Sequence, residues 1–265
     1  MAGVNPWGPL RNNRPPSWKF EATVQICRTI LEFDGINTAV SKAPVEHRLL
    51  TTITESRAPG IQLTVHRDKK NPFGSAPEFI RNKGAQFRMQ GFLENYKETE
   101  TISPTELCRR MGNGLLTESE YWKESLLELS LGPPRNPQWI ITRKKLDYRP
   151  DLPNDYTFPL VKEILKLAEL CDLDGGLTPA QFCHAFMGNE DCGVKQAYKR
   201  IVSDSDTPQV SINKDAERGI REIMQLMAKY KPKGGGVSYG AGWLFEKNGA
   251  FYTSEAGKEL LATFS

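Results

Sequence analysis

The chain has 265 residues, of which 38% are hydrophobic and 25% charged, which is enough apolar material for one large domain or two small ones with their own cores. No apolar run approaches the length of a membrane span, and the N-terminus lacks the apolar core of a signal peptide, so we expect a cytoplasmic protein without a membrane partner. The net charge of +3 does not indicate nucleic-acid binding by itself, and five cysteines with no C-x-x-C pair argue against a disulfide scaffold or a zinc knuckle.

Positive charge is nevertheless concentrated in two segments. From Arg57 to Lys97 there are eight basic and three acidic residues, and from Lys195 to Lys233 there are nine basic and five acidic residues. Solvated helix faces are the alternative explanation of any single cluster. Two clusters in similar structural contexts favour a negatively charged partner.

A polar arm precedes the first predicted helix. Residues 1–16 are rich in proline, asparagine and glycine, and they carry Arg11 and Arg14 as candidate phosphate contacts, unless the arm is simply a poorly ordered terminus. From Trp18 onward, apolar residues recur at helical spacing, which predicts a helix that ends at Asp34-Gly35. The elements predicted next are a helix over residues 45–53 and a short strand over residues 60–65.

A basic helix is predicted to begin at Ser75. The letters S-A-P-E at residues 75–78 supply the capping serine, the early proline and the acidic residue of a helix start. Its apolar residues are expected to face inward and its basic residues outward. The outward residues that we expect to contact or approach bases are Arg81, Asn82, Lys83, Gln86 and Arg88. Residues 91–103 then resemble two strands with a polar turn, and the following S-P pair predicts another helix with a serine cap.

The chain is predicted to divide after residue 146, because the segments around it are dense in proline and asparagine. An amphipathic helix over residues 158–171 opens the second half and stops at the letters D-L-D-G-G. A short helix capped by Thr178 follows, and then a basic helix from Gly193 whose Val194, Ala197, Tyr198, Ile201 and Val202 can face a core. Its candidate base contacts are Lys195, Gln196, Lys199 and Arg200.

The C-terminal segments are predicted to form a helix followed by a β-hairpin. A helix is predicted over residues 214–230, then a strand, an Asn248-Gly249 hairpin turn, a second strand and a short capped helix. Helices followed by a two-stranded wing are the plan of a winged helix. We therefore predict a mainly α protein with small β-hairpins (α+β), made of two winged-helix-like subdomains at residues 1–146 and 147–265.

A metal site is the first chemical alternative, since Cys171, Cys183, His184 and Cys192 lie close together in the sequence. Zinc ligands usually come as two close pairs, whereas adjacent Cys183 and His184 on a helix point about 100° apart. Cysteines at core-facing helical positions are ordinary small hydrophobic residues. We therefore predict no metal ligands in this chain.

A compact Mg²⁺-dependent nuclease is the second chemical alternative. The letters G-I-Q-L-T-V-H-R-D-K-K end a predicted strand with Asp68 and Lys70, and Asp34 or Glu55 could act as the distant acid. A basic surface loop explains the same letters, and it would make Lys69 and Lys70 phosphate contacts together with Lys231 and Lys233. No nucleophile signature such as G-x-S-x-G and no phosphate-binding loop is present.

Two long segments resemble a known family. The letters YTFPLVKEILKLAELCDLDGGLTPAQFCHAFMG, from residue 156, are similar to the start of the second winged-helix subdomain in the recognition region of type IIS restriction and nicking endonucleases of the FokI and AlwI kind. The segment GWLFEKNGAFYTSEAGKELL, from residue 242, resembles the wing and the following turn of those proteins.

The resemblance implies a role in restriction-modification, with both halves recognising double-stranded DNA sequence-specifically. In that family a separate C-terminal nuclease region cuts the DNA, so this chain would act with an associated nuclease region or subunit, and Mg²⁺ would belong to that partner. A winged-helix transcription or protein-interaction module, whose basic patches meet an acidic protein, is the alternative from a different functional class.

Overall fold

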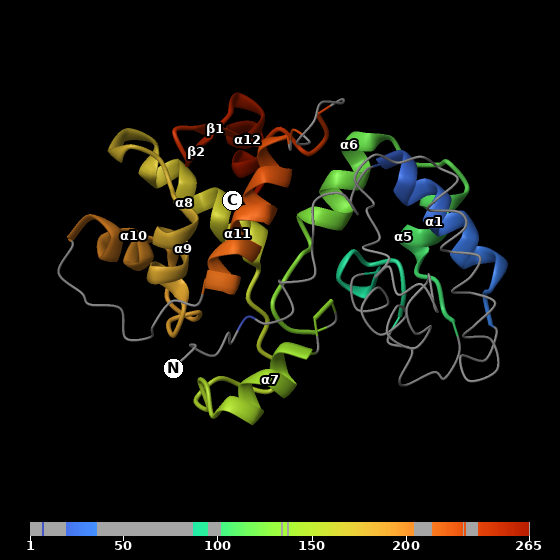
Figure 1. Ribbon diagram of the computed structural model, residues 1–265, viewed down its shortest axis with the longest axis horizontal. Coiled ribbons are helices and arrows are strands. Elements are labelled where there is room, and N and C mark those ends of the chain that lie inside the picture. The colour runs from blue at the N-terminus through green and yellow to red at the C-terminus, as the bar shows by residue number, and fades with distance from the viewer. Residues whose placement is uncertain are drawn as a thin grey trace, which may run out of the picture. The chain divides into compact units, whose positions relative to one another are not determined.

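The computed structural model describes residue 7 and residues 20–35, 87–94, 102–133, 135–136, 138–203, 214–229, 231 and 238–264 (Figure 1). In these segments the fold is mainly helical, with one two-stranded antiparallel hairpin, which confirms the predicted mainly α class. None of the helices in the described part of the chain is long and apolar enough to cross a membrane.

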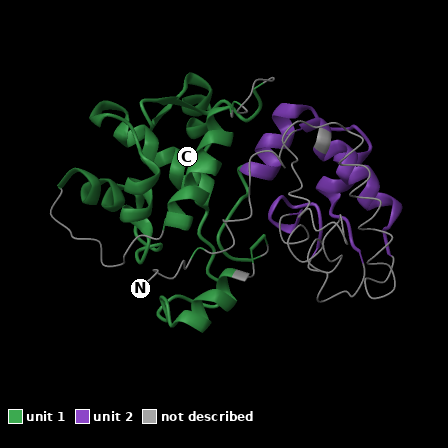
Figure 2. Cartoon of the chain, in the orientation of Figure 1, with its two compact units in different colours: residues 1–14, 127–231, 238–265 green, residues 15–126, 232–237 purple. Residues whose placement is uncertain are grey.

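The chain forms two compact units. Unit 1 contains residues 1–14, 127–231 and 238–265, and unit 2 contains residues 15–126 and 232–237 (Figure 2). The division of the chain after residue 146 stays a prediction. The two winged-helix subdomains stay a prediction.

Unit 2 is built on the packing of α1 (Phe20–Glu32) against α5 (Glu106–Gly112). Gly112 allows this approach, because a Cβ there would lie 2.7 Å from Leu31 Cδ1. The Arg28 side chain also donates to the Gly112 carbonyl at 3.0 Å. The predicted first helix is therefore confirmed, including its end at Asp34-Gly35, where Gly35 has a φ of +75°.

The predicted serine cap of the next helix was wrong. Thr105 is the N-cap of α5, and its hydroxyl accepts from the Cys108 N–H at 3.1 Å. The preceding Pro104 forms an isolated bridge with Leu93, which keeps the chain extended up to the cap. Two further elements complete the described part of unit 2: α6 (Glu118–Tyr121), with a Thr117–Glu120 capping box, and a π-helical turn (Trp122–Leu126).

Several predicted elements of the first half lie outside the described residues. They are the helix at 45–53, the strand at 60–65, residues 75–86 of the basic helix, and the turn at 95–101. The end of the basic-helix segment is described, and Phe87, Met89 and Phe92 there are buried.

Unit 1 contains most of the regular structure. Its elements, in chain order, are α7 (Gln138–Leu146), α8 (Leu160–Cys171), a 3-10 turn (Asp172–Asp174), α9 (Pro179–Phe186), α10 (Val194–Ser203), α11 (Lys214–Ala228), β1 (Leu244–Lys247), β2 (Ala250–Thr253), α12 (Glu255–Leu261) and a 3-10 turn (Ala262–Phe264). The four helices predicted from residue 158 to residue 230, the hairpin and the final capped helix are confirmed. Helix α7 was not predicted.

Local sequence signals explain these elements. Thr178 caps α9 in a capping box with Gln181, and Pro179 occupies the first turn. The hairpin turns at Asn248 and Gly249, whose φ values of +54° and +81° suit the type I′ turn favoured by Asn-Gly. Leu177, between α8 and α9, forms a bridge with Phe251 of β2 and so brings a third extended segment to the hairpin.

The core of unit 1 is aromatic and includes a residue of the N-terminal arm. Phe158, Phe182 and Phe186 have ring centroids 5.0–6.4 Å apart. Trp7 is fully buried against Phe158 and Phe182, at centroid distances of 6.3 and 6.1 Å. Such stacked and tilted aromatic contacts are favourable beyond the area that they bury.

Candidate nucleic-acid interface

Helix α10 is positively charged, because it contains two lysines and one arginine and no acidic residue. It packs against α8 and α9, with Ala197 buried and the Tyr198 hydroxyl bonded to the Asp174 carboxylate. That bond raises the pKa of Tyr198 above its ordinary value. Ile201 is only half-buried, and Val202, which was expected to face a core, is 49% exposed.

Three of the predicted DNA contacts lie together on the outer face of α10. At about 100° per residue, Lys195, Lys199 and Gln196 fall within an arc of about 100°, and all three are exposed. Within the described residues, the salt bridges involve neither lysine. The face therefore offers two ammonium groups and one amide to a ligand.

Arg200, the fourth predicted contact on α10, is directed into unit 1. Its guanidinium donates to the Ala185 carbonyl at 3.0 Å and lies 3.6 Å from Cys192 Sγ. Ala185 belongs to the last turn of α9, where carbonyls lack helical partners. In this geometry Arg200 links α10 to α9 by a hydrogen bond. Its contact with a base stays a prediction.

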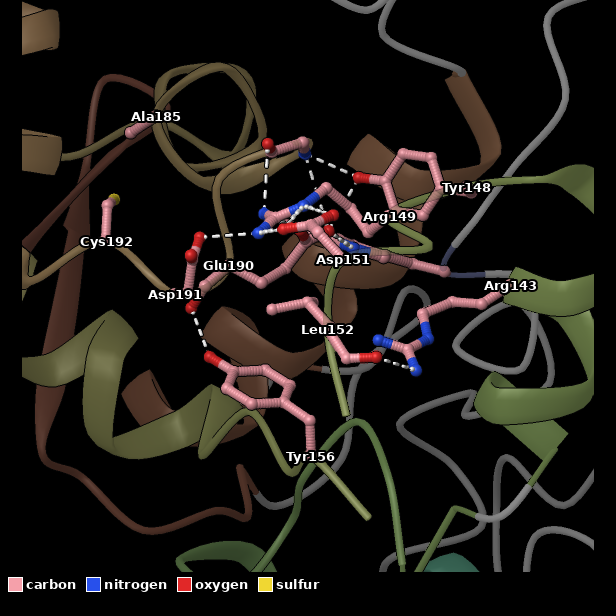
Figure 3. A network of polar contacts seen from close by, with 12 residues as sticks. Arg143, Tyr148, Arg149, Asp151, Leu152, Tyr156, Ala185, Glu190, Asp191 and Cys192 are labelled. Carbon is pink, nitrogen blue, oxygen red and sulfur yellow. Dashed lines mark hydrogen bonds and ion pairs between the residues drawn. The ribbon is translucent and has the colours of Figure 1, made fainter. Parts of the chain in front are cut away.

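The turn between α9 and α10 is held by a network of charged and aromatic side chains (Figure 3). Its centre is Glu190, which is fully buried. One carboxylate oxygen accepts from Trp7 Nε1 at 2.9 Å and from the Tyr148 hydroxyl at 2.6 Å, and the other pairs with Arg149 at 3.2 Å. The Tyr156 hydroxyl donates to the Glu190 backbone carbonyl at 2.6 Å. A buried carboxylate needs such partners, because burial alone penalises its charge.

Arg149 connects this turn to the loop after α7. It is 13% exposed and pairs with Asp151 at 2.6 Å and Asp191 at 2.8 Å, besides Glu190. The hydrogen bond that Arg149 donates to Asp151 is the main cause that raises the pKa of Arg149, and the same bond lowers the pKa of Asp151. Burial beside the network raises the pKa of Tyr148, and it raises that of Tyr156 to about 12.

Every arginine in the described segments has a partner within the protein. Arg88 and Arg135 have partners, and the others donate to carbonyl or carboxylate oxygens: Arg28, Arg109, Arg110, Arg143, Arg149, Arg200, Arg218 and Arg221. Lysines therefore supply the cationic groups that remain for a ligand in these segments.

The remaining predicted site residues are dispersed. Lys231 is exposed in unit 1, and Arg88 is half-buried in unit 2. Asp34, one distant acid of the nuclease hypothesis, pairs with Arg109 at 2.7 Å. The predicted residues that lie outside the described segments are Arg11, Arg14, Glu55, Asp68, Lys69, Lys70, Arg81, Asn82, Lys83, Gln86 and Lys233.

The clustered cysteines are thiols of the core and the turn. Cys171 and Cys183 are buried, Cys192 is half-buried, and all three are free. Burial raises the pKa of Cys171 to about 12 and also raises that of Cys183. No group of three or more His, Cys, Asp or Glu side chains among the described residues could hold a metal ion.

Sequence reasoning missed two exposed lysines, Lys144 and Lys145 on α7. The signal was present in the run R-K-K at residues 143–145, in a helix without an acidic residue. The prolines on both sides of this run favour a linker instead, which hides the helix.

Comparisons with known proteins found no match: no family model, no curated protein and no solved structure matches the chain. The resemblance to type IIS endonucleases thus stays a prediction.

Proposed function

We propose that the chain binds double-stranded DNA sequence-specifically, as the recognition region or subunit of a type IIS-like restriction endonuclease. The observation that carries the proposal is α10. It is a helix without acids, braced on its inner side by Arg200 and Tyr198, that exposes Lys195, Gln196 and Lys199 on its outer side.

The chemistry of this face suits a DNA groove. An α-helix fits the major groove of B-DNA, where a glutamine amide can pair with both the N6 and N7 positions of adenine. Lysines bind phosphate as point charges and set the position of the helix. Gln196 would then read a base, while Lys195 and Lys199 would contact phosphates or nearby base edges.

The order of elements in unit 1 supports a winged-helix plan. Helices α8, α9, α10 and α11 precede the β1–β2 hairpin, and Leu177 joins the hairpin at β2. The hairpin would act as the wing, and Lys231 would contact phosphate. We propose a second, diverged winged-helix subdomain in the first half, where Arg81, Asn82, Lys83, Gln86 and Arg88 would approach bases.

The remaining basic residues complete the proposed interface. Basic residues of the N-terminal arm and of two further basic segments would hold phosphates: Arg11, Arg14, Lys69, Lys70 and Lys233. Cleavage would be carried out by an associated nuclease region or subunit, which would bind the Mg²⁺.

A protein-interaction module is the second candidate, and one observation favours it. Phe245 and Tyr252 stack at 5.3 Å on the hairpin, with Phe245 47% exposed. The nearby 3-10 turn exposes 98% of Leu173. Exposed aromatic and aliphatic side chains of this kind occur at protein interfaces.

Selection of bound duplexes from a random pool tests the proposal. We expect one short sequence to be enriched over successive rounds. Recovery of duplexes without any common sequence would refute sequence recognition and favour the protein-interaction module. Mg²⁺ in a parallel sample tests the compact nuclease: cleavage that Asp68→Ala abolishes would replace our proposal of a separate nuclease.

A further inference from the structure

Helices α7 and α10 share a pattern of charge. Among the described helices, they are the two that contain lysine and no acidic residue. Each has one arginine and two lysines: Arg143, Lys144 and Lys145 in α7, and Lys195, Lys199 and Arg200 in α10. Each helix therefore carries three positive charges without internal compensation.

In both helices the arginine faces inward. The buried Arg143 donates to the Leu152 and Pro153 carbonyls at 3.2 and 2.9 Å, and it lies over the Trp139 ring at 4.7 Å. Arg200 donates to a carbonyl of α9 in the same manner. The arginines thus hold the helices against the rest of unit 1, and the lysines lie on the outer faces.

The outer face of α7 consists of Ile141, Lys144 and Lys145. At about 100° per residue, Ile141 lies about 60° from Lys144 on one side and about 40° from Lys145 on the other. Both lysines are exposed, and Ile141 is 52% exposed. Lysines in the last turn of a helix also stabilise its dipole, but the dipole does not explain an exposed isoleucine between them.

The loop after α7 is fixed more firmly than a helix end requires. Asp147 and Arg149 have φ values of +51° and +48°, a left-handed conformation that is uncommon for residues other than glycine. Arg149 and Tyr148 from this loop bind Glu190 and the turn that leads into α10. One network therefore sets the positions of both basic helices (Figure 3).

We propose that the outer face of α7 is a second phosphate-contact surface, which grips the backbone of the duplex that α10 reads. The occupant follows from charge complementarity, since two lysines without a carboxylate partner among the described residues face outward beside one apolar side chain. Lys144 and Lys145 would each bind a phosphate, and Ile141 would contact a deoxyribose. This inference depends on the proposed DNA binding by unit 1.

The test measures affinity for the selected duplex across a range of salt concentrations. Each phosphate contact contributes about 0.9 to the slope of log affinity against log salt. Lys144→Ala/Lys145→Ala should make that slope less steep by about 1.8. The variant should bind all duplexes more weakly and still prefer the selected sequence. Circular dichroism confirms that the variant is folded.

The matched control is Lys166→Ala/Lys258→Ala, which removes the same charge from unit 1. Those lysines pair with Glu163 and Glu255 at 2.9 Å, so the slope should not change. An unchanged slope in the α7 variant, or an equal fall in the control, would overturn this inference alone. Failure of the wild-type chain to bind any duplex would refute the proposed function and this inference with it.

Discussion

At the scale of single residues, Glu190 joins three parts of unit 1 that are distant in the sequence. It binds Trp7 of the arm, Tyr148 and Arg149 of the loop after α7, and it lies in the turn before α10. Nothing in the letters N-E-D at residues 189–191 indicated this role. An acidic residue in a turn is ordinarily exposed, and its partners are brought to it only by tertiary structure.

Replacing Glu190 should destabilise unit 1 strongly. Glu190→Ala removes the carboxylate oxygen that accepts from the Trp7 indole and the Tyr148 hydroxyl, and it removes one of the carboxylates around Arg149. Breaking a buried charge pair typically costs about 3–5 kcal/mol. Urea unfolding measured by circular dichroism should show a loss of this order.

Asp155→Ala is the control for that prediction, because Asp155 is an exposed acid in the loop that leads to α8. A loss in Glu190→Ala no larger than that in Asp155→Ala would mean that the bonds of Glu190 contribute little to stability. The network would then not fix the α9–α10 turn.

The Arg149–Asp151 pair should make stability depend on pH in the acid range. The hydrogen bond from Arg149 lowers the pKa of Asp151 in the folded state. Its contribution is therefore complete above the unfolded pKa of about 3.9 and is lost as the pH falls through the lower folded value. Asp151→Asn should lower the urea midpoint at pH 7, and the difference between the two proteins should shrink as the pH falls below the folded pKa of Asp151. A difference that persists unchanged at pH 2 would contradict this assignment.

At the scale of elements, capping and turn signals predicted the second half well. Thr178, Pro179 and Gln181 start α9 as expected, and Asn248-Gly249 forms the hairpin turn. These signals are local, since the residues that form each cap or turn are neighbours in the sequence. For this reason they could be recognised without any tertiary information.

Helix α7 shows where such local reasoning fails. Its apolar residues Trp139, Ile140 and Ile141 are consecutive, so they lack the spacing of an amphipathic helix. Prolines on both sides indicated a linker. The helix is fixed instead by distant contacts of Trp139, Arg143 and the loop that follows it.

Two single variants separate the roles proposed for α10. Lys199→Ala should weaken binding to every duplex and lower the salt slope by about 0.9, because it removes one phosphate contact. Gln196→Ala should cost about 1–3 kcal/mol on the selected duplex and relax the preference at one base position. Affinity measurements on single-base variants of the duplex distinguish these outcomes, and identical effects of the two variants would contradict the assigned roles.

At the scale of the whole molecule, the small net charge does not show that the arginines and the lysines have different roles. In the described segments arginines hold the fold together, and exposed lysines on α7 and α10 remain for a ligand. The sequence located the basic helix at Lys195 and Lys199 from its charge and periodicity. It did not indicate that Arg200 turns inward or that residues 138–146 form a helix, because both depend on packing partners that are distant in the chain.

The measurement that tests the central claim most directly compares the affinity of the wild-type chain for its selected duplex and for a scrambled duplex of the same composition. Both are measured by competition at physiological salt. Sequence-specific proteins bind their sites about a thousandfold or more tightly than other DNA, and our account predicts a preference of that order. Equal affinity for the two duplexes would contradict it.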